Sequence, residues 1–218
     1  MAATTLGFNA PLLQPISITS GPVVSVSQFG AVGDGKKDDT AAIQSALNYV
    51  KANGGTLNFD AGHTYLVSQV LTIANAHNFM IDGNGATIKM AAGAPVDYEH
   101  AIFRVQTSDH FGVTELTLDG NRANRPASSE QVPAHNVDIV GSHDFSFSDV
   151  NAINAVMDGF LVWGVNRADT STYARNGLFL NCQADNGFRQ GMTIANGENI
   201  QVIGGAYTNT HELDPGAS

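Results

Sequence analysis

The chain has 218 residues, of which 43% are apolar and 14% are charged, a composition that predicts a folded domain with a sizeable core rather than a disordered segment. Ten lysines and arginines against twenty aspartates and glutamates give a net charge of -10, which argues against nucleic acid or an anionic membrane as the principal partner. All arginines lie at or after Arg104, so the second half can still carry a local basic patch for an acidic substrate.

Residues 1–22 are expected to form an extended N-terminal arm, because Pro11, Pro15 and Pro22 interrupt a short apolar stretch. The arm has neither a basic start nor an unbroken apolar run, so it does not resemble a Sec signal peptide. No apolar run in the chain approaches the length that spans a membrane. If the protein is exported, we expect it to leave without an N-terminal Sec signal of its own, as an extracellular protein or as a component of a phage virion.

A glycine-rich and aspartate-rich loop follows in the stretch "FGAVGDGKKDDTAAIQSAL". The spacing of Gly30, Gly33 and Gly35 matches neither the dinucleotide-binding fingerprint nor a Walker loop, and aspartates would repel a phosphate. Asp38 or Asp39 is instead expected to cap the start of a helix, where a carboxylate accepts hydrogen bonds from the first free amides. The loop is therefore predicted to be structural.

An amphipathic helix is predicted from about Thr40, and Asn53-Gly54-Gly55 supplies its stop. The apolar face consists of residues at helical spacing: Ile43, Ala46, Leu47 and Val50. After this helix the period of the apolar residues changes to two, which is typical of short strands bounded by turns.

A loose repeat runs through the rest of the chain, each unit placing a short apolar strand before a corner rich in Asn, Asp or Gly. Aligning Asp82-Gly83-Asn84 with Asp119-Gly120-Asn121 gives a spacing of 37 residues, which indicates a solenoid with insertions. Short strands with polar corners favour a parallel β-helix over a propeller, and the lack of a second helix excludes a helical solenoid. The repeated segments are "FMIDGNGATI", "LTLDGNRANR", "FSFSDVNAIN", "LFLNCQADNG" and "VIGGAYTNTH".

The helix is expected to cover the open end of the first coil, because a stack of coils ends in an apolar cross-section with unpaired strand edges. The predicted organisation is an arm over residues 1–22 and a single β-helix domain over residues 23–218. The sequence stops just after a strand without a second covering element, so we expect the β-helix to continue beyond Ser218.

The glycine-rich stretch, followed by "GGTLNFDAGHTYLV", resembles the N-terminal signature of the pectate-lyase-like right-handed β-helix superfamily. That superfamily includes polysaccharide lyases, epimerases, glycosidases and phage tailspikes. "LTLDGNRANR" most resembles the catalytic module of mannuronan epimerases. The resemblance covers residues 24–67 most clearly, and it implies an all-β, right-handed parallel β-helix with an N-terminal capping α-helix.

The resemblance is incomplete where that family carries its chemistry. In mannuronan epimerases an aromatic-Gly-Phe segment leads into an Asp-Pro-His-Glu motif that holds the catalytic acid and base. Here Asp158-Gly159-Phe160 leads instead into Leu161, Val162 and Trp163, without a carboxylate or an imidazole. Arg189 resembles an arginine of the epimerase groove, with Gln190 in place of the usual following histidine. An alignment shifted by one coil is equally defensible.

The function expected from the resemblance is action on an acidic polysaccharide by β-elimination, as a lyase or an epimerase. That chemistry needs a cation at the substrate carboxylate, a base for the proton at carbon five, and an acid for the leaving oxygen. Arginine or Ca²⁺ suits the first role, and no cofactor is required. Candidates for binding the carboxylate are Arg122, Arg125 and Arg189, candidates for base or acid are His135, Asp158, Tyr173 and His211, and Trp163 could stack on a sugar ring.

Two alternatives stay open. A glycoside hydrolase of the same fold would need two carboxyl groups flanking the bond, for which Asp158 and Asp185 are candidates, with Glu212 and Asp214 near the end of the chain. A noncatalytic polysaccharide-binding or tailspike-type module would need none of them. The partner is expected to be a polysaccharide, with uronate the favoured component, and both a monomer and a trimer are compatible with the sequence.

No metal site is predicted. The stretch "DGNRANRPASSE" matches an EF-hand loop at its first, third and twelfth positions but is broken by Ala123 and Asn124, and the histidines show no ligand pairing. Cys182 is the sole cysteine, so it cannot form an intrachain disulfide and is expected to be a buried thiol.

Overall fold

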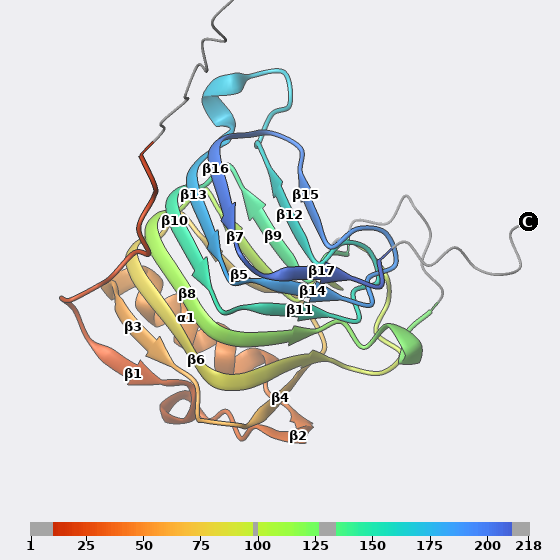
Figure 1. Ribbon diagram of the computed structural model, residues 1–218. Helices are drawn as coiled ribbons and strands as arrows, with labels where there is room; N and C mark the ends of the chain where they lie inside the picture. The colour runs from red at the N-terminus through yellow and green to blue at the C-terminus, as the bar shows by residue number, and fades with distance from the viewer. Residues whose placement is uncertain (1–10, 98–99, 127–133, 211–218) are drawn as a thin grey trace, which may run out of the picture.

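The computed structural model describes residues 11–97, 100–126 and 134–210. Their strands are paired in parallel across successive coils and build two sheets, one of twelve strands and one of five (Figure 1). One α-helix, α1 (Thr40–Asn53), precedes most of the strands. The predicted parallel β-helix is confirmed.

The elements of the first sheet are β1 (Val23–Ser25), β2 (Asp34–Asp38), β3 (Gly55–Asn58), β4 (Thr64–Val67), β6 (His77–Met90), β8 (Asp109–Asp119), β10 (His143–Ser148), β11 (Asn151–Ile153), β13 (Ala174–Leu180), β14 (Gln183–Asp185), β16 (Gly197–Ile203) and β17 (Ala206–Thr208). The second sheet consists of β5 (Leu71–Ala74), β7 (Phe103–Gln106), β9 (Val137–Val140), β12 (Phe160–Trp163) and β15 (Met192–Ile194). Short 3₁₀ turns are η1 (Val26–Phe29), η3 (Arg122–Asn124) and η4 (Thr170–Thr172).

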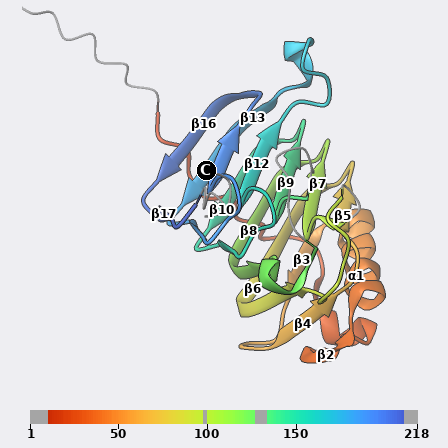
Figure 2. The same cartoon turned by 90° about the vertical axis from the view of Figure 1, so that its right-hand side faces the viewer.

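Each coil passes once through the second sheet and twice through the first, because the chain bends sharply within the first sheet. The bend lies inside the long strands β6 and β8, and it separates β10 from β11 and β13 from β14 in later coils. Figure 2 shows the second sheet with β12, β9, β7 and β5 side by side and α1 beyond β5. The outer face of this sheet is the one that carries the cluster described below.

The helix begins and ends as the sequence predicts, with Gly54 after its last residue. Its apolar face is buried in the core. Gln44 covers the edge of β5, because its side chain accepts a hydrogen bond from Thr72 N at 2.9 Å and donates one to Thr72 O at 2.7 Å. An edge strand whose backbone groups are satisfied in this way cannot pair with another chain.

The two aspartates at the start of the helix have different roles: one binds the first helical amide, and the other binds the glycine-rich loop. Asp38 Oδ1 accepts a hydrogen bond from Thr40 N at 2.9 Å. Asp39 occupies the N-cap position but is fully buried, and its two oxygens accept from the amides of Val32 and Gly33, each at 2.9 Å. The glycine-rich loop is therefore folded around the Asp39 carboxylate, which makes no capping hydrogen bond to the helix.

The predicted phase of the first repeat is wrong. Asp82 pairs with Thr114 in the next coil, and Asp119 pairs with Lys89, so the two Asp-Gly-Asn segments are not equivalent. The first lies at the bend within the first sheet, and the second lies at the end of that sheet. Both kinds of corner need residues that tolerate left-handed backbone, and the sequence pattern cannot distinguish them.

Asparagine holds the corners. Of the fifteen non-glycine residues with positive φ among those described, ten are asparagines. Several form ladders from coil to coil: Asn199 donates to Asn176 at 2.9 Å, and Asn176 donates to Asp144 at 2.8 Å. Asparagine suits such corners because its short polar side chain tolerates left-handed backbone and can bond to the next coil.

Phenylalanines fill the space between the sheets. Phe79, Phe111 and Phe145 occupy one column, with ring centroids 5.0 and 5.5 Å apart. Phe179 is fully buried and contacts Phe147 and Phe160, so it joins the first sheet to β12 of the second. Cys182 is also buried, as expected, and burial raises the pKa of its thiol to about 12.

Residues 11–22 contain no helix or strand and run across the outer face of the first sheet. Leu13 N donates to Gln201 Oε1 at 2.9 Å, and Ile16 N donates to Ser146 Oγ at 2.8 Å. At the other end of this segment, Thr56 N in β3 donates to Pro22 O at 2.8 Å. The segment therefore connects the first coil to the last described one.

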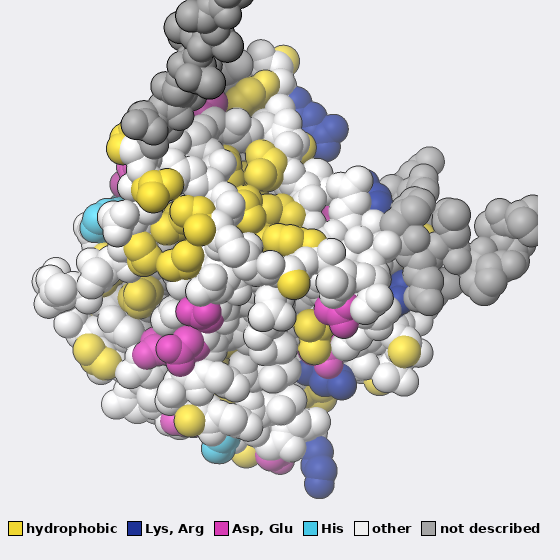
Figure 3. All heavy atoms as spheres, in the orientation of Figure 1, with side chains coloured by type: hydrophobic (Ala, Val, Ile, Leu, Met, Phe, Trp, Pro, Cys, Tyr) yellow, Lys and Arg dark blue, Asp and Glu magenta, His cyan; other side chains and the backbone are white. Residues whose placement is uncertain are grey.

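The last described coil leaves apolar side chains partly open. Figure 3 shows apolar side chains gathered over β15, β16 and β17. Ile194 and Val202 are exposed by 44% and 41%, and Ile200 and Tyr207 are half-buried against the core. In the described part of the chain, no helix is long and apolar enough to cross a membrane.

Candidate functional site

A column of four side chains crosses the outer face of the second sheet. Strand pairing places Arg104 beside Asp138, Asp138 beside Leu161, and Leu161 beside Thr193. Their neighbours along each strand point into the core, because successive side chains in a strand alternate between faces. An outer face is ordinarily solvated, yet Arg104 and Asp138 are 4% and 1% exposed. A buried ion pair here requires a specific explanation.

Arg104 and Asp138 form that pair. Arg104 Nε and Nη2 donate to Asp138 Oδ2 at 3.2 and 3.1 Å. Asp138 Oδ1 is buried and has no hydrogen-bond partner among the described residues. Burial raises the pKa of Asp138 to about 7, and Arg104 opposes that rise. The column thus contains a carboxyl group that can change its protonation state near neutral pH.

A second polar group lies at the corner where the chain enters the second sheet. His135, Asp158 and Gln190 each lie two positions before the first residue of a strand of that sheet, and they stack on successive coils through backbone hydrogen bonds. We call His135, Asp158, Arg189, Gln190 and Thr193 the corner cluster. It combines residues from three coils that are far apart in the sequence.

Asp158 is the centre of the corner cluster and is fully buried. Arg189 Nε donates to Asp158 Oδ1 at 2.8 Å, and Arg189 Nη2 donates to Oδ2 at 2.5 Å. Gln190 N donates to Oδ1 at 3.2 Å, and Thr193 Oγ1 lies 2.9 Å from Oδ2. The Arg189 side chain is 31% exposed, so this buried carboxylate holds a guanidinium that reaches solvent.

His135 packs against the same aspartate. Its Nδ1 accepts a hydrogen bond from Asp158 N at 3.4 Å and lies 3.5 Å from Asp158 Oδ2. Burial lowers the pKa of His135 to about 4; Asp158 opposes this shift, whereas Arg189 and Arg104 add to it. The imidazole is therefore neutral at pH 7, and a neutral imidazole can take part in proton transfer.

Replacing His135 with glutamine should reduce the loss of unfolding free energy that accompanies a fall in pH below 6.5. The folded pKa of about 4 lies below the unfolded value of 6.5, so the unfolded chain binds the proton first and stability falls as the pH drops from 6.5 to 4. The shift corresponds to about 3 kcal/mol across that window. Urea unfolding at several pH values measures the slope. His143→Gln, which changes a half-exposed histidine of the first sheet, is the control, and equal slopes in both variants would contradict the expectation.

Trp163 and Tyr173 lie at the far end of β12 from Asp158. Trp163 is on the outer face, and Arg167 Cζ is 5.5 Å from its ring centroid. The Tyr173 hydroxyl donates to Arg167 O at 3.0 Å. Both aromatic residues thus border the same face as the column, but neither belongs to the corner cluster. The Tyr173 hydroxyl proton is already donated to a carbonyl of its own loop.

The other predicted arginines take different places. Arg125 is 9% exposed, and its guanidinium donates to the carbonyls of Ala94, Pro95, Gly120 and His100, so it braces a loop rather than facing a substrate. Burial lowers the pKa of Arg125 to about 10. Arg122 donates to Asn186 Oδ1 at 2.5 Å, outside the corner cluster. His211, Glu212 and Asp214 lie outside the described residues.

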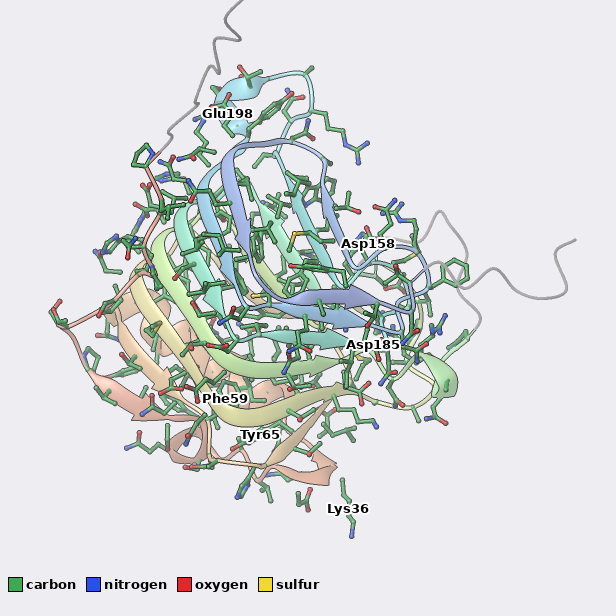
Figure 4. The ribbon with its side chains drawn as sticks, in the orientation of Figure 1. Lys36, Phe59, Tyr65, Asp158, Asp185 and Glu198 are labelled. Atoms are coloured by element: carbon green, nitrogen blue, oxygen red, sulfur yellow. The ribbon has the colours of Figure 1, made fainter. Side chains whose placement is uncertain are left out.

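Asp185 does not match the acid of a hydrolase. Its carboxylate accepts hydrogen bonds from Thr208 and Asn209 at 2.8 and 2.7 Å, and these hold its pKa below the usual value. A general acid needs a raised pKa instead. Figure 4 shows Asp158 and Asp185 on separate segments, and Asp158 is engaged by Arg189. The geometry does not favour the hydrolytic pair.

Sequence reasoning brought forward three members of the corner cluster, Asp158, His135 and Arg189, but missed Arg104 and Asp138. A signal for the missed pair is present in "AIFRVQ" and "HNVDIV", where one charged residue interrupts an apolar strand. Within the described ranges, no group of three or more His, Cys, Asp or Glu side chains could hold a metal ion.

The fold and the family place this chain among carbohydrate-active β-helix proteins. Residues 23–211 match the family described as rhamnogalacturonase A/epimerase, pectate lyase-like, and the chain belongs to that family. The matched residues include the column of the outer face and the corner cluster.

Several of the individual relatives are proteins of Azotobacter vinelandii. The chain is 40% identical to mannuronan C5-epimerase AlgE2 over 111 residues, 46% of this chain and 11% of that protein. It is 32% identical to alginate lyase 7 over 110 residues, 46% of this chain and 13% of that protein. The solved A-module of mannuronan C-5 epimerase AlgE6 matches with a TM-score of 0.57 at 26% identity, covering 84% of this chain and 56% of that one. The chain thus spans about a tenth of the length of these curated relatives.

Proposed function

We propose that this protein binds an acidic polysaccharide along the outer face of the second sheet and acts on its uronate residues by β-elimination, as a lyase or an epimerase. The observation that carries the proposal is the corner cluster, in which a buried carboxylate presents Arg189 beside a neutral imidazole. The relatives that modify mannuronan and alginate support the substrate class.

Arg189 is assigned to the substrate carboxylate. β-Elimination requires that the negative charge on this carboxylate be neutralised before the neighbouring carbon can lose its proton. A guanidinium suits this role because it is always charged and matches a carboxylate with paired N–H donors. Trp163, on the same outer face, is assigned to stacking on a sugar ring along the chain of the polysaccharide.

His135 is assigned to proton transfer. Of the predicted acid and base candidates that the structure describes, His135 and Asp158 lie beside Arg189, and the Asp158 oxygens are occupied by other donors. The His135 imidazole is neutral at pH 7, as a proton acceptor must be. Among the described residues, the side chains of this face do not provide the set of oxygen ligands that a protein-bound Ca²⁺ requires.

A noncatalytic polysaccharide-binding module is the second candidate. It is favoured by Leu161 and Trp163, which stand on the outer face where the resemblance to epimerases implies an acid and a base. The same arginine and aromatic residue would serve binding alone. The two candidates share a ligand class and differ only in turnover.

Proton NMR of alginates, pectate and glycosaminoglycans incubated with the protein, with and without Ca²⁺, tests the proposal. We expect vinyl signals from a lyase, or altered residue signals without chain scission from an epimerase. Arg189→Lys should lower turnover at least about tenfold, because lysine keeps the charge but loses the paired geometry. The control is Arg175→Lys, on the exposed part of the first sheet, which should match the parent protein.

Binding without turnover on any substrate would support the noncatalytic module. New reducing ends without vinyl signals would indicate hydrolysis and contradict the proposed chemistry. The absence of both binding and turnover across the panel would contradict the acidic polysaccharide itself.

A further inference from the structure

Asp158 was a candidate acid or base, but its surroundings point to another role. A general acid or base must come within hydrogen-bonding distance of the atom that it protonates or deprotonates. The Asp158 side chain is fully buried, and each of its oxygens already faces donors from the following coil. A substrate could reach this carboxylate only after the pair with Arg189 had separated.

The donors come from a single short segment of the next coil. Arg189, Gln190 and Thr193 lie within five residues, at the turn into β15, and all of them contact Asp158. Thr193 Oγ1 also lies 2.6 Å from Gln190 Oε1, which closes the segment on itself. One buried carboxylate therefore sets the orientation of the segment that carries the exposed arginine.

Such an arrangement adds little to stability. Desolvation of a buried ion pair offsets most of its Coulomb energy, so an apolar residue at position 158 would serve the core equally well. What the pair supplies is geometry, because an arginine held through Nε and Nη2 loses rotational freedom before a ligand arrives. A preorganised cation costs less ordering entropy on binding than a mobile one.

We infer that Asp158 is a positioning residue that fixes Arg189 as the binding group for a uronate carboxylate, and is neither the acid nor the base of the reaction. The inference rests on the proposed function for the identity of the ligand. The positioning role itself concerns only residues of this chain.

Two measurements test the inference. The first is the affinity for alginate and pectate oligosaccharides. Asp158→Asn should weaken it at least about tenfold, and Thr193→Val about threefold, because each loses part of the contact that orients Arg189. Thr193→Ser keeps the hydroxyl and should restore the parent affinity. Asp144→Asn, which changes a half-exposed aspartate of the first sheet, should have no effect.

The second measurement is the NMR signal of the Arg189 Nε–H group, which needs no ligand. We expect a slowly exchanging signal in the parent protein and in Thr193→Ser, and fast exchange in Asp158→Asn and Thr193→Val. If Asp158→Asn fails to fold, the two threonine variants still decide the question.

The outcomes separate the two proposals. If no oligosaccharide binds but Arg189 Nε–H is protected only when Asp158 and the hydroxyl are present, the substrate class fails and the positioning role stands. If Asp158→Asn removes one limb of the pH–rate profile while affinity and the Nε–H signal stay unchanged, Asp158 is an acid or base and the inference is overturned.

Discussion

Replacing Arg104 with methionine is expected to lower the free energy of unfolding by about 3–5 kcal/mol at pH 8, because the change leaves Asp138 buried without its ion pair. Methionine fills much of the same volume, so the loss is mainly electrostatic. The two side chains are 5% and 1% exposed, and Asp138 Oδ1 already lacks a partner among the described residues. Urea unfolding of the variant and the parent protein measures the difference.

The loss should shrink in acid. Burial already raises the folded pKa of Asp138 to about 7, above its unfolded value of 3.8, and removal of Arg104 raises it further. The folded variant then binds a proton that the unfolded chain does not, so its stability increases as the pH falls from 8 to 5. We expect a smaller difference from the parent protein at pH 5 than at pH 8.

Two further variants make the test specific. Arg104→Met combined with Asp138→Leu removes both charges and should recover most of the lost stability. Arg175→Met breaks the exposed pair with Glu198 and should cost less than about 1 kcal/mol. A cost for Arg104→Met no larger than for Arg175→Met would show that the pair is not electrostatically buried.

The buried ion pair of Arg104 and Asp138 also bears on the function of the outer face. Two apolar residues would cover this part of the second sheet at a similar or better stability. Arg104 and Asp138 lie in one column with Thr193, which contacts the corner cluster. A buried ion pair at this position therefore contributes charge to the face more than it contributes stability.

Local patterns in the sequence predicted the fold well. The spacing of Ile43, Ala46, Leu47 and Val50 gave the helix and its buried face, and Gly54 marked its end. Asparagine and aspartate corners predicted the stacked coils because backbone conformation at a corner depends on the residue that occupies it. The phase of the first repeat was wrong because two kinds of corner share that chemistry.

The corner cluster was harder to predict because its members belong to different coils. Asp158 and Arg189 are separated by 31 residues, but His135 and Asp158 are separated by only 23, so no constant period relates them. Their contacts depend on loop lengths, including the loop around η4, and on the strand pairing of the second sheet. Predicting the pair of Arg104 and Asp138 would have required the register of β7 and β9 and the direction in which each side chain points.

Truncating Phe179 to alanine is expected to cost about 3–5 kcal/mol of unfolding free energy, because it removes a fully buried ring and leaves a cavity. Its ring centroid lies 6.0 Å from Phe145, 5.5 Å from Phe147 and 5.6 Å from Phe160. Phe179→Leu keeps most of the apolar volume and should cost clearly less. Equal costs for the two variants would mean that the surrounding rings close the cavity.

Phe179→Ala should also show whether packing in the core supports the geometry of the corner cluster. Phe160 is the first residue of β12 and follows Asp158 by two positions, so the cavity left by Phe179→Ala lies against the strand that holds the corner cluster. We expect hydrogen exchange of the amides at the start of β12 to accelerate in Phe179→Ala and to change little in Phe179→Leu. Exchange in β5, on the far side of the second sheet, should follow only the overall loss of stability. Acceleration confined to β12 would show that the phenylalanine stack supports the geometry of Asp158 and Arg189, whereas equal acceleration in both strands would show that it supports only the fold.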